Sequence, residues 1–93
     1  MFHLSWDEAK RKRTIALRGL DFARTQEVFR GVTLEVEDTR REYGETRMLC
    51  VGFLDNRMVM VGYVPHGSTR RIFSMRKCNA REIRRYSPYF QQA

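Results

Sequence analysis

The chain has 93 residues, of which 42% are hydrophobic and 31% charged, a composition typical of a folded domain rather than a disordered tail. Its 18 Lys and Arg residues against 11 Asp and Glu give a net charge of +7, which indicates an anionic partner such as nucleic acid or an acidic protein. One modest core fits this length, no apolar run approaches the roughly 20 residues of a membrane span, and the N-terminus lacks a secretory signal, so we expect a single cytoplasmic domain over residues 1–93 without membrane contact.

The N-terminal segment predicts a short strand followed by a helix. Residues 2–4 alternate between apolar and polar side chains, as an edge strand does. Ser5 and Glu8 have the spacing of a capping box, which would start a helix that runs to about Arg18 and stops at Gly19. We expect a mostly apolar stripe of this helix to face the core, and its members are Trp6, Ala9, Arg13, Ala16, Leu17 and Leu20.

A second helix is predicted directly after the first. Asp21 would cap it, it would run from Phe22 to about Arg30, and Gly31 would end it. Because only two or three residues join the two helices, they should form a helical hairpin.

Beyond Gly31 the pattern changes to strands separated by turns. Residues 39–46 form a charged loop with a glycine turn. The run 58–64 is apolar on both faces and should be the central strand. The expected strands cover residues 32–38, 47–54, 58–64 and 69–77, with turns at 55–57 and 65–68.

The C-terminal segment predicts a short helix. Asn79 and Glu82 repeat the capping-box spacing, and the helix would reach about Tyr86 before Pro88 stops it. Residues 89–93 form a tail that either docks through its two aromatic side chains or frays. The expected fold class is therefore α+β, with two N-terminal helices packed on one face of an antiparallel sheet of about four strands and a short C-terminal helix.

The cysteines and histidines do not indicate a metal or cofactor site. Cys50 and Cys78 lack ligand spacing, and in a reducing compartment they fit buried apolar positions better than a disulfide. His3 and His66 lie far apart with no acidic cluster beside them, so we expect no cofactor and no metal. His66 could act as a general base, although a histidine in a turn is more often solvated.

Arginine dominates the basic residues, with 15 Arg against 3 Lys. The arginine fork grips phosphate through paired hydrogen bonds and stacks on bases, which favours contact with RNA or DNA. The alternative is that many arginines form solvated faces and ion pairs with the acidic residues.

Cleavage of RNA is one reaction that this residue set could support. RNA carries its own nucleophile, the 2′-hydroxyl, so a protein can act by aligning the phosphate, stabilising the phosphorane charge and moving protons. Arginines suit the first two tasks, and a glutamate, tyrosine or lysine suits the third. The candidate catalytic residues are Arg47, Arg71, Arg76, Lys77, Glu82 and Tyr86. The candidate RNA contacts are Arg18, Tyr63, Arg70, Arg81, Arg84 and Arg85.

Two plainer readings apply to these candidates. Glu82 could merely cap its helix, and the arginines that follow it could form a solvated face. Strict alternation along the strand at 69–77 would place Arg71, Phe73 and Met75 on one face and Arg70, Ile72, Ser74 and Arg76 on the other, of which only one set can face the helices.

The order and spacing of several motifs resemble the BrnT-type toxins over about residues 4–86. The loop and strand entry Arg40–Arg47 resembles their Arg-x-x-Tyr-Gly-Glu-x-Arg pattern. The N-terminal features are Trp6-Asp7-Glu8, Lys10, Gly19-Leu20-Asp21-Phe22 and Val28-Phe29. The C-terminal features are Gly52, Tyr63, Arg71-Ile72-Phe73-Ser74-Met75-Arg76-Lys77, Glu82 and Tyr86.

The resemblance implies a RelE-like fold and a metal-independent endoribonuclease, the toxin of a bacterial type II toxin–antitoxin pair. It implies a BrnA-type antitoxin as partner, which neutralises the toxin by direct binding and carries a DNA-binding domain. The complex would repress its own operon, so operator DNA would be contacted indirectly, through the antitoxin.

The chain departs from the family pattern at the end of the first helix. Family members usually read Asn-x-x-Lys-His-Gly there, whereas Leu17 and Arg18 occupy the lysine and histidine positions here. If that histidine contributes to cleavage, Arg18 could replace only its charge, because arginine does not act as a base near neutral pH.

The sequence thus predicts a toxin ribonuclease in which Arg47, Arg71 and Arg76 hold the phosphate. Lys77, Glu82 or Tyr86 would move protons, and the sequence does not rank these three. Two alternatives stay open: a non-enzymatic basic binding module, and an inactive toxin kept as an antitoxin-binding co-repressor.

Overall fold

The computed structural model describes residues 2–91, which form an α+β fold built on one mixed sheet. The strands are β1 (His3–Trp6), β2 (Leu34–Glu37), β3 (Met48–Leu54), β4 (Arg57–His66) and β5 (Thr69–Lys77). The helices are α1 (Glu8–Arg18), α2 (Thr25–Arg30) and α3 (Ala80–Phe90), and a 3₁₀ turn, η1 (Phe22–Arg24), leads into α2.

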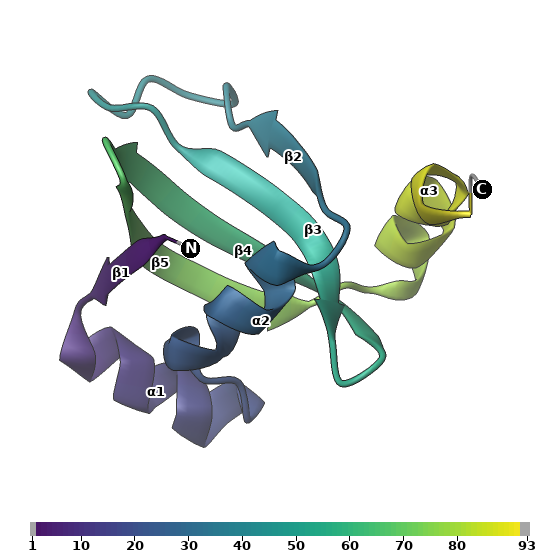
Figure 1. Ribbon diagram of the computed structural model, residues 1–93, viewed down its shortest axis with the longest axis horizontal. Helices are drawn as coiled ribbons and strands as arrows, with labels where there is room; N and C mark the ends of the chain where they lie inside the picture. The colour runs from purple at the N-terminus through teal and green to yellow at the C-terminus, as the bar shows by residue number, and fades with distance from the viewer. Residues whose placement is uncertain (1, 92–93) are drawn as a thin grey trace.

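The sheet has five strands in the order β1-β5-β4-β3-β2 (Figure 1). Strands β2 to β5 form the expected antiparallel meander, and β4 is the central strand as predicted. The prediction of about four antiparallel strands is incomplete, because β1 joins the same sheet and pairs in parallel with the first half of β5. Local alternation marked β1 as an edge strand but holds no information about a partner more than 60 residues away along the chain.

The hairpin between β3 and β4 has the turn that its sequence requires. Asp55 and Asn56 both adopt positive φ, 51° and 62°, the backbone of a two-residue turn whose twist matches that of the flanking strands. Arg24 binds the Asp55 carboxylate through two nitrogens at 2.7 and 2.8 Å, which ties this hairpin to η1.

Helix α1 begins two residues later than its sequence suggested, with Asp7 rather than Ser5 as its cap. The N-cap is Asp7, whose side chain accepts a hydrogen bond from the Lys10 backbone N–H at 3.0 Å. The predicted Ser5 capping box is wrong because Ser5 is committed to β1, where it pairs with Arg71. The end of the helix is as expected, with Gly19 in the left-handed region at φ 68°.

The predicted apolar stripe of α1 is wrong. No residue of α1 is buried, and Leu17 is 76% exposed, whereas Leu20 beyond the helix end is only 7% exposed. Polar contacts hold the helix instead: Arg11 donates to the Asp21 carboxylate at 2.8 and 3.0 Å, and Arg18 donates to the Met75 carbonyl at 3.0 Å. The helix lies beside β5 rather than over the middle of the sheet (Figure 1), so its apolar residues have no core to enter.

The second helical segment follows the prediction closely. Asp21 caps it by accepting from the Ala23 N–H at 2.9 Å, η1 and α2 together cover the expected span, and Gly31 ends it. Phe22 and Val28 are fully buried and anchor this segment to the sheet.

Two apolar clusters lie on opposite faces of the sheet. The larger one, under α2, combines Phe22 and Val28 with inward residues of β3, β4 and β5. The smaller one combines Val51, Met58 and Met60 with Tyr86 and Phe90 of α3, among others. Both cysteines are buried and unpaired, as expected, and burial raises the pKa of the Cys50 thiol to about 12 and that of Cys78 to about 11.

Helix α3 starts at the predicted capping box but runs further than predicted. Pro88 lies inside the helix rather than ending it. A proline there removes one backbone donor, and packing of the Phe90 ring edge-to-face on Phe53 at 5.0 Å holds the last turn in place. Tyr89 stays exposed, and residues 92–93 of the predicted tail lie outside the described residues.

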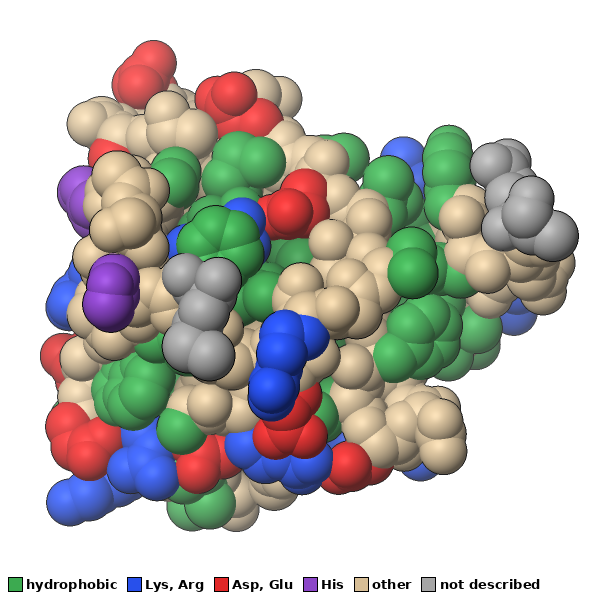
Figure 2. Space-filling model, in the orientation of Figure 1, with side chains coloured by type: hydrophobic (Ala, Val, Ile, Leu, Met, Phe, Trp, Pro, Cys, Tyr) green, Lys and Arg blue, Asp and Glu red, His purple; other side chains and the backbone are tan. Residues whose placement is uncertain are grey.

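Surface properties differ between the two ends of the molecule. In Figure 2, basic and acidic side chains are mixed over α1 and α2, whereas hydrophobic side chains gather where α3 meets the sheet. Within residues 2–91, no helix has the length and apolar character that crossing a membrane requires.

The position of α1 predicts a sharp contrast between two leucines. Leu20→Ala should lower the free energy of unfolding by about 2–5 kcal/mol, because it leaves a cavity in the core. Leu17→Ala should change it by about 0.5 kcal/mol or less, because that side chain is solvated. Urea unfolding followed by circular dichroism measures both. Equal losses for the two variants would contradict this placement of α1.

Candidate functional site

A β-bulge in β5 decides which side chains reach each face of the sheet. Ser74 pairs with Gly62 and Ile72 pairs with Tyr63, so Phe73 is an extra residue without a partner. Ile72 and Met75 therefore both enter the core under α2. The prediction of strict alternation along β5 is wrong, because the extra residue resets the period.

The bulge brings several predicted candidates onto the sheet face turned away from α1 and α2, here called the α3 face. It carries Arg71, Ser74 and Arg76, which pair with Val64, Gly62 and Met60 of β4. Phe73 also lies over Gly62, where a Cβ atom would stand 2.6 Å from the Phe73 ring. Glycine at that position is thus what allows Phe73 and Ser74 to lie close against β4.

Arg76 and Glu82 form a two-pronged ion pair that joins β5 to α3. Arg76 Nη1 and Nη2 each donate to one Glu82 carboxylate oxygen at 2.7 Å. Glu82 also accepts from the Asn79 backbone N–H at 2.9 Å, so the capping residue itself orients the carboxylate. The Arg76 side chain is 40% exposed and that of Glu82 is 17% exposed, so the arginine is the more accessible partner of the pair.

The ion pair sets the protonation state of Glu82. Arg76 lowers the pKa of this carboxyl to about 2, and Glu82 in turn raises the pKa of Arg76. A carboxylate with so low a pKa is a poor proton acceptor near neutral pH. Its position fits a residue that orients Arg76 better than one that takes a proton.

A groove of about 350 Å³ lies beside this ion pair, between α3 and the loop that follows β2. Arg76, Arg85 and Tyr86 line one wall, and Asp38 and Arg40 line the other. Tyr86 thus stands in the same groove as the Arg76 side chain.

Buried Asp38 organises the loop between β2 and β3. It accepts hydrogen bonds from Arg40 Nε and Nη2, both at 2.8 Å, and from the Tyr43 hydroxyl at 3.0 Å. Arg40 holds the pKa of Asp38 far below its usual range. The Asp38 backbone N–H also donates to the Arg47 carbonyl at 2.8 Å, so the loop is fixed at the start of β3. Asp38 was not among the residues predicted to be functional, and the only signal for it was an acid two residues before Arg40.

Arg47 contacts two aromatic rings at the edge of the α3 face. Its Cζ lies 4.4 Å from the centre of the Tyr43 ring and 4.7 Å from that of Phe73. Glu45 lies 3.5 Å from its Nε, which is buried and finds no hydrogen-bond partner within the described part of the chain. Tyr43 and Phe73 are site residues that sequence reasoning missed, although the family-like loop motif contains Tyr43.

Two predicted RNA contacts lie in the packing on the opposite face. The Arg70 guanidinium is enclosed by the rings of Phe2, Phe29 and Tyr63 at 3.5, 4.5 and 4.4 Å and pairs with Glu35 at 3.3 Å. Tyr63 is 4% exposed and its hydroxyl donates to Glu35. Burial also raises the pKa of Tyr63 above its usual range. The structure therefore does not bring these two residues to the candidate site.

The remaining predicted residues fall into three places. Lys77 lies on the helix side of the sheet, in a groove with Asp21 and Arg24, and so points away from Arg76. Arg81 and Arg84 are exposed on α3. Arg18 lies beside the edge of β5. Among residues 2–91, no group of three or more His, Cys, Asp and Glu side chains is placed to hold a metal ion.

The free energy of unfolding should depend on pH in a way that shows the contribution of the Arg76–Glu82 pair. Because the Glu82 pKa is lowered from its ordinary 4.5 to about 2, the pair stabilises the folded state above pH 4.5 and loses this effect as the pH falls toward 2. Wild type should therefore unfold with a larger free energy than Glu82→Gln at neutral pH, and the difference should shrink between about pH 5 and 3.

Urea titrations at a series of pH values make this measurement. Glu37→Gln is the matched control, since Glu37 forms no ion pair in the described residues and should follow the wild type. If the difference in free energy of unfolding between wild type and Glu82→Gln stays constant down to pH 3, the result would argue against the ion pair.

Comparison with known proteins agrees with the resemblance seen in the motifs. The chain matches a family model described as the ribonuclease toxin, BrnT, of type II toxin–antitoxin systems over residues 6–82. The match includes every element from α1 to β5 and the first turn of α3. No curated protein matches the chain.

Proposed function

Because this chain belongs to the BrnT family of ribonuclease toxins, we propose that it cleaves RNA on the α3 face, around Arg76. The observation that carries this proposal is the partly exposed Arg76 side chain, oriented by Glu82 and set in one groove with Tyr86. The enzyme would act without a metal ion, in the cytoplasm, and would stop growth by destroying messenger RNA.

The proposed reaction is an in-line attack of the 2′-hydroxyl on the neighbouring phosphate. The 2′-oxygen bonds to phosphorus as the bond from phosphorus to the 5′-oxygen breaks, which leaves a 2′,3′-cyclic phosphate and a 5′-hydroxyl. One proton must leave the 2′-oxygen and one must reach the 5′-oxygen.

Arginines would bind the phosphate and the charge that develops on it. Arg76 is oriented before substrate arrives, so little reorganisation is needed in the transition state. Arg47, in contact with Tyr43 and Phe73, supplies a second cation at the edge of the same face. Arg71 is exposed further along this face and would hold a neighbouring phosphate.

Of the three candidates for proton transfer, Tyr86 is the best placed. Glu82 has a low pKa and both of its oxygens are occupied by Arg76. Lys77 lies on the other side of the sheet. Tyr86 lines the groove with Arg76, and its ring lies 5.7 Å from the Arg85 guanidinium, so its hydroxyl is the proton-transfer group of the three that shares the groove with Arg76 and is not tied up in the ion pair.

The family also supports a regulatory partner. A type II toxin is neutralised by an antitoxin protein, here proposed to be of the BrnA type, which would bind this chain directly. The pair would then repress its own operon through the DNA-binding domain of the antitoxin.

A second candidate function is that of an inactive toxin that serves as an antitoxin-binding co-repressor. The observation in its favour is Arg18, which stands where the family usually has histidine. It cannot act as a base near neutral pH, and it donates to the Met75 carbonyl. An inactive toxin of this kind would bind its antitoxin but would not cleave RNA.

Expression of the chain alone in a bacterium tests the proposed function. Wild type should arrest growth and fragment RNA, whereas Arg76→Ala should reduce cleavage by roughly 10²–10³-fold and allow growth, because it removes transition-state stabilisation. Arg30→Ala is the matched control, because Arg30 is an exposed arginine of α2 on the opposite side of the sheet, and this variant should remain toxic. Intact RNA with wild type, or an Arg76→Ala protein as toxic as its parent, would contradict the proposal.

Tyr86→Phe separates proton transfer from RNA binding. Loss of the hydroxyl should lower kcat by roughly 10²–10⁴-fold and leave KM nearly unchanged, because the ring stays in the groove. Steady-state cleavage of a short RNA by purified protein gives both constants. An unchanged kcat would remove Tyr86 from the proton-transfer role.

A further inference from the structure

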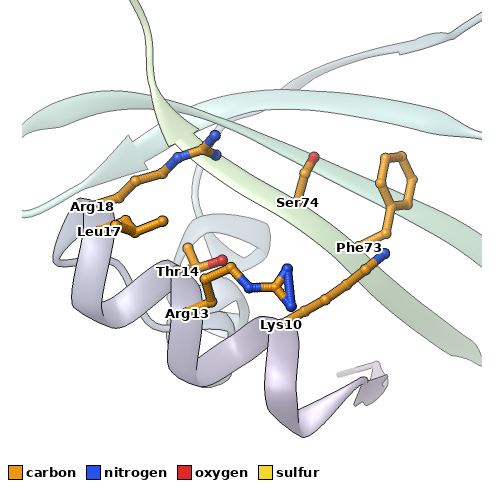
Figure 3. Close-up of a pocket in the computed structure, with 7 residues that line it drawn as sticks. All are labelled: Lys10, Arg13, Thr14, Leu17, Arg18, Phe73 and Ser74. Carbon is orange, nitrogen blue, oxygen red and sulfur yellow. The ribbon is translucent and has the colours of Figure 1, made fainter.

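A cleft runs between α1 and the part of β5 that no second strand covers. β1 pairs with Thr69–Ile72 only, so residues 73–77 present one open edge. The cleft has a volume of about 210 Å³. Figure 3 shows its lining, which comprises Lys10, Arg13, Thr14, Leu17, Arg18, Phe73 and Ser74.

The cleft is basic and carries no compensating acid. Lys10, Arg13 and Arg18 project from one side of α1 toward β5 (Figure 3), and no carboxylate is among the lining residues. None of the three forms an ion pair within residues 2–91. Arg11 on the same helix shows the contrast, because it is bound to Asp21 and Glu8.

Arg18 is fixed in place by the backbone of the open edge. One of its nitrogens donates to the Met75 carbonyl at 3.0 Å, which leaves the other donors of the fork free. The hydroxyls of Thr14 and Ser74 add two neutral donors to the same cleft. Cations and hydroxyls without an acid form a set that binds a phosphate group.

The cleft is next to the proposed cleavage site. Phe73 lines it and also lies against Arg47, while Ser74 belongs to the same sheet face as Arg76. An RNA strand bound at Arg76 could therefore cross the edge of β5 and continue along α1. Leu17, which has no core to enter, and Phe73 would provide apolar contact for a base or ribose.

We propose that this cleft is a second RNA subsite, in which Lys10, Arg13 and Arg18 bind a phosphate that flanks the cleaved bond. The inference rests on the proposed function, since it extends the same substrate across β5. It also gives Arg18 a role in binding that needs no proton transfer.

Salt-dependent binding of an RNA that cannot be cleaved tests this subsite. The probe is a short single-stranded RNA with 2′-O-methyl groups, and fluorescence anisotropy gives its affinity at several salt concentrations. Each phosphate of a single strand that the protein neutralises contributes about 0.7 to the slope of log K against log salt concentration, so Lys10→Ala/Arg13→Ala should lower the slope by up to about 0.7, the contribution of the one phosphate bound in the cleft. Lys12→Ala/Arg30→Ala removes the same charge from exposed sites outside the cleft and should keep a slope close to wild type.

Two further comparisons make the outcome specific. Arg13→Lys keeps the charge and should keep the slope. Thermal unfolding should be unchanged in the double variant, because its two side chains make no hydrogen bond or ion pair in the part of the chain described.

The results separate this inference from the proposed function. A slope lowered in the cleft variant but not in the control supports the subsite, even if wild type never cleaves RNA. Equal slopes for the two double variants overturn the subsite, even if wild type cleaves RNA at Arg76.

Discussion

The ion pair between Arg76 and Glu82 is the interaction on which the candidate site depends. It joins the last strand to the last helix, and the capping residue Asn79 fixes it from the backbone side. Together with the apolar packing of Tyr86 and Phe90 on the sheet, the pair positions α3 so that Tyr86 lines the groove. An arginine paired with a carboxylate keeps its own charge and a fixed direction, although the pair as a whole is neutral. For binding a phosphate at a defined angle, direction matters as much as charge.

The elements of the fold were largely predictable, because each rests on local chemistry. The positions of strands β3 to β5, the Asp55-Asn56 turn and the Asn79–Glu82 capping box depend on residues close together in the chain. The parallel pairing of β1 with β5 does not, and the sequence predicted β1 only as an edge strand. The prediction that Pro88 ends the helix failed for a related reason. Phe53, which is distant in the sequence, packs on Phe90 and stabilises the last turn of α3.

The candidate site was predictable in part. Arg47, Arg76, Glu82 and Tyr86 were named from residue type and resemblance, and the structure places them around one sheet face. The sequence alone did not reveal the bulge at Phe73. A bulge is defined by the pairing with the neighbouring strand, and that pairing is not known from the sequence. Asp38 was missed because its contacts with Arg40 and Tyr43 depend on how the loop folds. The cleft beside α1 was missed because Arg13 and Leu17 were expected to face the core.

The central claim is that the 2′-hydroxyl of RNA is the nucleophile and that no metal takes part. The most direct measurement is the chemistry of the product ends, made with purified protein and a defined RNA in the presence of EDTA. The account predicts a 2′,3′-cyclic phosphate and a 5′-hydroxyl, and complete protection of the RNA by a single 2′-deoxy substitution at the cleaved nucleotide. Cleavage that survives that substitution, or that leaves a 5′-phosphate, would contradict it.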